Sequence, residues 1–215
     1  MEFIHHLIDF ILHIDVHLKD IVSQYDTLTY LILALIIFCE TGLVVTPFLP
    51  GDSLLFAAGT LAGAGYLHLG ILISVLLAAA IIGDNLNFTI GKYIGHKLIS
   101  SKRRIIKKEY LDKTHSYYEK HGGKTVIIAR FIPIVRTFAP FVAGLGSMMY
   151  RKFIVYCITG NLLWIFSFTL AGFLLGSNEW IKNNFTLVTL GIIGFSMLPV
   201  LIGVIKTTVL KNKSA

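Results

Sequence analysis

ARFIPIVRTFAP, at residues 129–140, interleaves two arginines and two prolines in an otherwise apolar part of the chain. An arginine at the centre of a bilayer costs roughly 2.5 to 3.5 kcal/mol on insertion scales, so it usually faces a polar cavity or a buried partner. Prolines remove helical hydrogen bonds, which membrane proteins tolerate only where the backbone is shielded from lipid. We therefore expect a polar site that contains Arg130 and Arg136, in a helix broken by Pro133 and Pro140.

The composition of the chain predicts an all-α integral membrane protein. The 215 residues are 55% hydrophobic and only 14% charged, whereas soluble domains carry about 25% charged residues. This length suits a single transmembrane domain, at residues 25–210, with a cytoplasmic tail at 211–215. Ten of the 19 lysines and arginines lie between Lys92 and Lys124. That concentration indicates a cytoplasmic segment at about 96–124 rather than a nucleic-acid-binding surface.

The N-terminal residues 1–24 have the pattern of an amphipathic helix that lies along the membrane interface. Apolar residues recur at spacings of three and four, and histidines and aspartates occupy the opposite face. His13 and His17 have the spacing of metal ligands, but we prefer a solvated polar face and expect no metal site. Cys39 and Cys157 lie in apolar runs, which is typical of small core or lipid-facing residues.

A second broken apolar segment, at about residues 28–65, carries Glu40 and Asp52. Asp52 could cap a helix, whereas Glu40 lies deep in an apolar run where capping does not explain it. The segment is too broken for two clean spans, so we expect a re-entrant hairpin whose bend contains Pro47, Pro50 and Gly51. Basic residues flank residues 125–150 on both sides, which predicts a second hairpin entering from the cytoplasmic face.

The two halves of the chain have matching parts. Each hairpin is followed by an apolar span with a glycine and an acid or amide, which are Gly83-Asp84 in the first half and Gly160-Asn161 in the second. Inverted repeats with broken helices are the architecture of many secondary transporters. We therefore expect an inverted repeat, with Asp84, Asn85, Asn87 and Asn161 as candidate cavity-lining residues. A location of the first three near one membrane face is equally compatible with the sequence.

One predicted hairpin is acidic and the other is basic. Opposite charges lower one another's burial cost, so Glu40, Asp52, Arg130 and Arg136 could simply neutralise each other and hold the hairpins together. In the functional interpretation, the two guanidinium groups bind a phosphate through bidentate hydrogen bonds. The carboxylates then take up protons, because burial disfavours their charged form.

These residues resemble the signature of the DedA family, also called the SNARE-associated or VTT-domain family. The resemblance covers about residues 28–205 and rests on three groups of motifs. They are Arg130-Phe131-Ile132-Pro133 with Arg136-Thr137 and Pro140-Phe141-Val142-Ala143-Gly144; Glu40 with Pro50-Gly51-Asp52; and Gly83-Asp84 with Phe88, Gly91 and Lys92. Asn161 and Trp164 fit the family's later span, which adds Trp164 to the candidate cavity-lining residues.

The resemblance implies a multi-pass flippase of the bacterial cytoplasmic membrane. Bacterial members are linked to the return of undecaprenyl phosphate from the outer to the inner leaflet for reuse in cell-wall synthesis. Others move phospholipids such as phosphatidylethanolamine, and several depend on the proton motive force. The implied roles are phosphate binding for Arg130 and Arg136, and proton coupling or gating for Glu40 and Asp52. The implied coupling ion is H⁺, and no cofactor is expected.

Other functions remain compatible with parts of the sequence. A proton-coupled small-ion or drug antiporter would use the same carboxylates, and a scaffold protein would tolerate neutral substitutions of all four charges. A lipid phosphatase needs a positioned nucleophile or acid, and no histidine accompanies Arg130, so we do not expect an enzyme. The sequence leaves open which lipid phosphate is carried and whether copies of the chain form a homo-oligomer.

Overall fold

The computed structural model describes residues 27–43, 51–100 and 124–176, together with residues 178, 187, 188, 191 and 194. In these parts of the chain the expected all-helical fold is confirmed, and no strand occurs in them. The helices are α3 (Leu28–Gly42), α4 (Gly51–Gly63), α5 (Leu69–Ser100), α7 (Lys124–Ala129), α8 (Pro133–Leu145) and α9 (Tyr150–Leu175). Several predictions lie outside the described residues: the helix at 1–24, Pro47 and Pro50, most of the basic segment and of the last span, and the tail.

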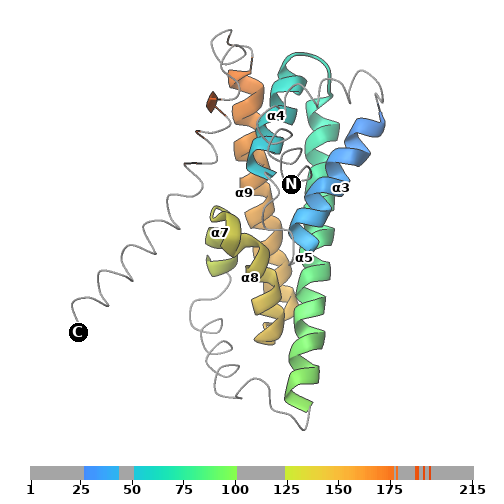
Figure 1. The fold of residues 1–215 in the computed structure, drawn as a ribbon, viewed down its shortest axis with the longest axis vertical. Coiled ribbons are helices and arrows are strands. Elements are labelled where there is room, and N and C mark those ends of the chain that lie inside the picture. The colour runs from blue at the N-terminus through green and yellow to red at the C-terminus, as the bar shows by residue number, and fades with distance from the viewer. Residues whose placement is uncertain are drawn as a thin grey trace, which may run out of the picture.

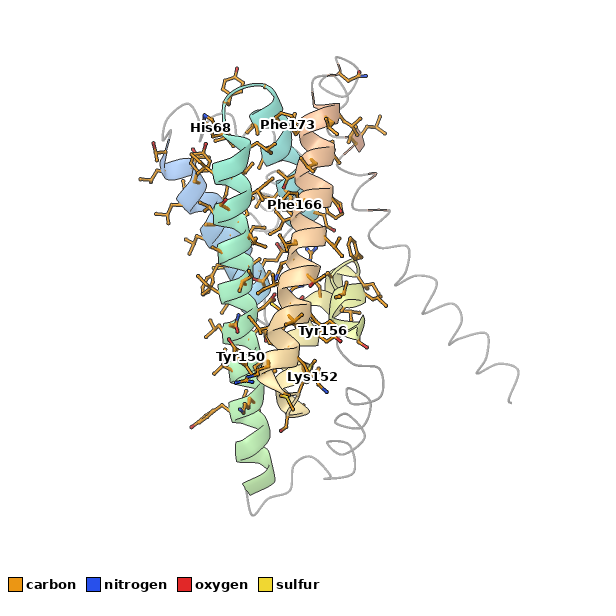
Figure 2. The ribbon with its side chains drawn as sticks, turned by 180° about the vertical axis from the view of Figure 1, so that it is seen from behind. His68, Tyr150, Lys152, Tyr156, Phe166 and Phe173 are labelled. Carbon is orange, nitrogen blue, oxygen red and sulfur yellow. The ribbon has the colours of Figure 1, made fainter. Side chains whose placement is uncertain are left out.

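The two long helices α5 and α9 form the frame of the molecule. Their stretches Leu69–Ile94 and Tyr150–Leu175 have 26 residues each and are long and apolar enough to cross a membrane. At 1.5 Å per residue, each extends about 39 Å, against about 30 Å for a bilayer's hydrocarbon core. The two helices run in opposite directions, since His68 and Phe173 lie at one end of the molecule and Tyr150 and Lys152 lie toward the other (Figure 2).

The shorter helices are arranged as two pairs around this frame. Helices α3 and α4 lie beside one half of the long helices, and α7 and α8 lie beside the other half (Figure 1). Each pair contacts both long helices: α3 packs on α5 and α4 on α9, while α8 packs on α5 and α7 on α9. The two pairs therefore approach each other near the middle of the frame.

Apolar side chains cover both the inside and the outside of this bundle. Leu33, Leu55, Leu72 and Trp164 belong to a buried core between α3, α4, α5 and α9. A smaller buried cluster around Phe88 and Phe153 lies where α5, α8 and α9 meet. Large apolar residues are also exposed on the outer surface, as expected where the solvent is lipid; they include Leu31, Ile82, Val155, Phe166 and Leu174.

The helix break in the second half lies at residues 130–132. Helix α7 ends at Ala129, and α8 begins at Pro133, where a proline is favoured because the first helical N–H has no partner in any case. We expected Pro140 to break the helix as well, and this is wrong, since α8 continues through Pro140 to Leu145. The polar site therefore adjoins the turn before α8 and the first turn of that helix.

Candidate functional site

Arg136 lies in the first turn of α8 and joins the two helix pairs. Its Nη1 forms an ion pair with Asp52 Oδ1, and its Nη2 forms one with Glu40 Oε1. Asp52 lies in the first turn of α4, and Glu40 lies in the last turn of α3. All three residues are buried. The structure thus brings together three of the four charged residues that the sequence analysis selected.

The start of α4 is built around the Glu40 carboxylate. The backbone N–H of Gly51 donates a hydrogen bond to this carboxylate, and negative charge is favourable at the positive end of a helix. A Cβ atom on residue 51 would overlap both Glu40 oxygens. The missing side chain at Gly51 therefore allows Glu40 to reach the helix end and Arg136 at the same time.

Trp164 of α9 contacts both partners of the Arg136–Asp52 pair. Its Nε1 donates a hydrogen bond of 2.8 Å to Asp52 Oδ1. Its ring centroid lies 4.8 Å from Cζ of Arg136, which is within the range of a cation–π interaction. The indole is fully buried, so it fixes the orientation of the pair and keeps water from this side of it.

Arg130 has a different partner. It lies in the turn between α7 and α8, is only 1% exposed, and pairs through Nη2 with Asp84 Oδ2 of α5. We expected Asp84 to line a cavity or to lie near one membrane face, and its pairing with Arg130 was not predicted. The available signal was a carboxylate in the middle of a long apolar span, where a buried cation is the usual reason for its presence.

Two side chains of α9 complete the surroundings of Asp84. Asn161 Nδ2 donates to Asp84 Oδ2 at 2.8 Å, and the Cys157 thiol donates to the same oxygen at 3.1 Å. Arg130 Nη2 lies 3.9 Å from Cys157 Sγ. Cys157 was expected to be a small core or lipid-facing residue, and its only sequence signal was its spacing of four from Asn161 on the same helix.

The remaining candidates on α5 fall into two environments. Asn87 Nδ2 donates to the carbonyl oxygens of Thr41 at 3.0 Å and of Thr137 at 2.7 Å, so it ties the end of α3 and the start of α8 to α5. Asn85 bonds instead to the Ile81 carbonyl and to the Tyr150 hydroxyl. The structure places Asn87 beside the charged residues and Asn85 at the surface near Tyr150.

Several buried polar atoms of the site have no hydrogen-bond partner among the described residues. They are Glu40 Oε2, Asp84 Oδ1, Asn87 Oδ1, Asn161 Oδ1, and Nε and Nη1 of Arg130. Buried polar groups are normally paired, so these atoms identify where a polar ligand would gain hydrogen bonds. The two guanidinium donors suit the oxygen atoms of an anion.

Comparisons with known proteins identify relatives of this chain. The sequence matches the VTT domain over residues 49–174, a range that includes Asp52, Asp84, Arg130 and Arg136. It is 55% identical to Protein DedA of Escherichia coli K12 over 209 residues, 96% of this chain and 95% of that protein. It is 41% identical over 168 residues to an uncharacterized membrane protein of Mycobacterium leprae, covering 78% of this chain and 75% of that one.

A more distant relative is the inner membrane protein YqjA of Escherichia coli K12. The two are 33% identical over 148 residues, which cover 68% of this chain and 67% of YqjA. No solved structure matches the chain. The relatives therefore place the protein among membrane proteins.

Proposed function

The chain belongs to the VTT-domain, or DedA, family of membrane proteins, and from this premise we propose that it is a lipid-phosphate transporter of the bacterial cytoplasmic membrane. The proposed substrate is a polyprenyl phosphate such as undecaprenyl phosphate. The protein returns it from the outer to the inner leaflet, so that the carrier lipid is reused in cell-wall synthesis. Transport is coupled to protons and is not an enzymatic reaction.

The observation that carries this proposal is the incomplete hydrogen bonding of Arg130. This guanidinium is buried, yet its Nε and Nη1 have no acceptor among the described residues. Leaving buried donors unpaired costs about 1–3 kcal/mol or more for a charged group. A purely structural arginine would be expected to satisfy them, whereas a phosphate-binding arginine keeps them for its ligand.

The charge balance of the site supports coupling to protons. Glu40, Asp52 and Asp84 provide three carboxylates, and Arg130 and Arg136 provide two guanidinium groups. The ionised cluster is therefore already negative by one formal charge before an anionic headgroup arrives. Adding a phosphate to this low-dielectric site is favourable only if carboxylates are neutralised at the same time. Protonation of Glu40 or Asp52 would also release Arg136 to the substrate.

The short helices support the proposal that each pair is a re-entrant hairpin. Helix α3 has 15 residues, and α4 and α8 have 13 each. These lengths correspond to about 20–23 Å, which is less than the hydrocarbon thickness of about 30 Å. Because the pairs lie beside opposite halves of the long helices (Figure 1), we propose that they enter the membrane from opposite faces.

Two glycine contacts support an inverted repeat. The first contact joins α4 to α9: Gly59 of α4 packs on the Thr169 carbonyl, and Gly172 of α9 packs on the Phe56 carbonyl. The second contact has the same form and spacing: it pairs Gly144 of α8 with the Phe88 carbonyl, and Gly91 of α5 with the Phe141 carbonyl. Each proposed hairpin thus packs on the long helix of the other half in the same manner.

The orientation follows from the exposed basic residues. Lys92, Arg151 and Lys152 are exposed toward the same end of the long helices, and Lys152 points outward there (Figure 2). By the positive-inside rule this end is cytoplasmic. We therefore propose that the α7–α8 hairpin enters from the cytoplasm and the α3–α4 hairpin from the outside, with the lipid tail remaining in the bilayer.

Reconstitution with leaflet-resolved labelled lipids tests the function. Arg130→Ala and Arg136→Ala should each abolish transport of the polyprenyl phosphate while the purified protein remains monodisperse. Thr159→Ala is the control, because this exposed hydroxyl donates to the Val155 carbonyl of its own helix. Wild-type transport rates in both arginine variants would contradict the proposal.

Parallel arms of this experiment separate the alternatives. A phosphatidylethanolamine arm reports on a phospholipid flippase, and vesicles with a pH gradient but no lipid substrate report on an ion or drug antiporter. The polyprenyl phosphate arm should respond to the pH gradient. Equal rates with and without the gradient would remove the proposed coupling.

A further inference from the structure

We propose that Asp84 is the resident anion of Arg130, a positioning residue that the substrate phosphate displaces and that afterwards expels the phosphate. This inference rests on the proposed function in one respect, which is that the ligand that displaces Asp84 is a lipid phosphate. It adds a third carboxylate to the machinery, on a helix that belongs to neither hairpin. The step it explains is release of the phosphate, which two buried arginines alone would hold.

The first support is the isolation of the Asp84–Arg130 pair from solvent. Asp84 is 0% exposed and Arg130 is 1% exposed, so neither charge can exchange its partner for bulk water. Gly160 of α9 leaves space for the arginine, since a Cβ there would lie 3.1 Å from Arg130 Cγ. An ion in such a place must always have a partner, and Asp84 is the carboxylate that the structure provides.

The second support is that Asp84 remains held when Arg130 leaves. Its Oδ2 accepts hydrogen bonds from Asn161 and Cys157 of α9 at 2.8 and 3.1 Å. These donors keep the carboxylate oriented toward the arginine while the phosphate occupies the guanidinium. Asp84 is thus positioned to compete for Arg130 again, as soon as the phosphate can be solvated on the other side of the membrane.

The third support is that the exchange needs no unpaired intermediate. Nε and Nη1 of Arg130 have no acceptor among the described residues, while Nη2 binds Asp84. A phosphate oxygen can therefore bind one of these unused donors before the Asp84 bond breaks. Both edges of the guanidinium that allow a bidentate contact include Nη2, so the phosphate completes its bidentate contact as Asp84 leaves that atom. The charge of Arg130 stays compensated at every stage.

The position of the pair also gives it a mechanical role. The Asp84–Arg130 pair fastens the turn before α8 to the long helix α5, whereas the bonds from Arg136 to Glu40 and Asp52 fasten α8 to the other hairpin. A movement of the α7–α8 hairpin against both the frame and the α3–α4 hairpin requires both connections to open. A phosphate that binds Arg130 and Arg136 together opens both connections. The α7–α8 hairpin therefore moves only when phosphate occupies the site.

The central test separates phosphate binding from turnover in Asp84→Asn. Binding is measured with dodecyl phosphate on the purified full-length protein, and turnover is measured as the maximal rate of polyprenyl phosphate transport in proteoliposomes. Without the competing carboxylate, the dissociation constant for dodecyl phosphate should fall at least five-fold, within the usual range of coupling between sites. The maximal transport rate should fall at least ten-fold, because release is impaired. Asp84→Glu should restore part of the rate.

Controls distinguish this role from a structural one. Thr89→Ala lies on α5 with an exposed hydroxyl that bonds within its own helix, and it should change neither quantity. Weaker binding of dodecyl phosphate by Asp84→Asn, or an unchanged binding constant with an unchanged rate, would overturn the proposal. If Asp84→Asn does not fold, Asn161→Ala replaces it in this test, with Thr159→Ala as the control. Asn161→Ala removes one hydrogen bond to the Asp84 carboxylate. It should therefore shift the dissociation constant and the transport rate in the same directions as Asp84→Asn.

A second measurement makes the result independent of the substrate. In a Cys39→Ala background, Cys157 is the single cysteine of the chain, and it is fully buried against Asp84. Loss of the Asp84–Arg130 pair should increase the labelling of Cys157 by N-ethylmaleimide at least five-fold in Asp84→Asn. If the wild-type protein binds no dodecyl phosphate, the proposed substrate is wrong, and the labelling of Cys157 alone tests the role of the Asp84–Arg130 pair. Unchanged labelling in Asp84→Asn would then overturn that role.

Discussion

Trp164 and Asp52 are 112 positions apart in the sequence, and the indole Nε1 of the first donates a hydrogen bond to the carboxylate of the second. The same ring lies 4.8 Å from the guanidinium carbon of Arg136. One side chain of the frame therefore orients an acid from one hairpin and an arginine from the other. The geometry of the charged site is consequently set by α9 as much as by the hairpins themselves.

Two substitutions of Trp164 should have graded effects. Trp164→Phe keeps an aromatic face near Arg136 but removes the N–H, which costs about 1 kcal/mol of stability and should lower transport three- to ten-fold. Trp164→Leu also removes the cation–π contact, which contributes up to about 2 kcal/mol in a buried site, and should lower transport further. Transport rates and thermal unfolding of the purified variants measure both effects. Equal transport by the two variants would show that the ring face is unimportant.

Gly51→Ala should destabilise the protein although alanine favours helices. The new methyl group would overlap the Glu40 carboxylate. Glu40 would then have to give up its hydrogen bond to the backbone of residue 51 or its ion pair with Arg136. We expect a loss of about 2 kcal/mol or more, seen as a lower thermal unfolding midpoint in detergent. Gly70→Ala is the matched control, because no atom lies within 4 Å of its added Cβ. A midpoint of Gly51→Ala equal to that of Gly70→Ala would contradict the described contact.

Asn87→Ala should loosen both hairpins at once. It removes the Nδ2 donor to the Thr41 and Thr137 carbonyl oxygens, and each lost hydrogen bond costs about 0.5–1.5 kcal/mol. Hydrogen exchange should therefore increase in both the end of α3 and the start of α8. Increased exchange in α8 alone would mean that Asn87 does not connect the two hairpins.

Glu40 and Arg136 should show strong non-additivity. Breaking a buried pair by removing one member typically costs about 3–5 kcal/mol. Removing Arg136 alone leaves both Glu40 and Asp52 without their cation, whereas the double variant leaves only Asp52 in that state. The double variant Glu40→Gln, Arg136→Gln should thus be less destabilised than the sum of the single variants. A cycle of unfolding free energies measures this coupling. Simple additivity would indicate that the ion pair does not form in the membrane.

Glu40→Gln should also alter coupling to protons. A glutamine cannot take up the proton that would release Arg136, so the remaining transport should lose most of its dependence on a pH gradient. The ratio of transport rates with and without the gradient measures this effect. A ratio equal to that of the wild-type protein would assign the coupling to another carboxylate.

The charged residues of the site could be found from the sequence because each of them is expensive to bury. Arg130, Arg136 and Glu40 are conspicuous in apolar runs, and the high cost of a charge in lipid implies that partners exist. The identity of the partners could not be found in this way. Arg130 pairs with Asp84 rather than with the acidic hairpin, because the packing of helices decides which charges meet, and helical periodicity does not reveal which helices are neighbours.

Other features were missed for local reasons. Pro140 was expected to break a helix, yet α8 tolerates it, and the break occurs at residues 130–132, directly before Pro133. Cys157 carries no charge and looked like any small apolar residue, so its bond to Asp84 became visible only in three dimensions. Neither result could follow from composition or spacing alone.

The long separation between the two halves of the site has a consequence for biosynthesis. Asp52 and Glu40 precede their partner Arg136 by 84 and 96 residues. At translation rates of about 5–20 residues per second, the acidic hairpin exists for roughly 5–20 s before that arginine has been made. The ribosome therefore delivers two carboxylates before their countercharge exists, and the ion pairs between the two hairpins can form only after Arg136 has left the exit tunnel.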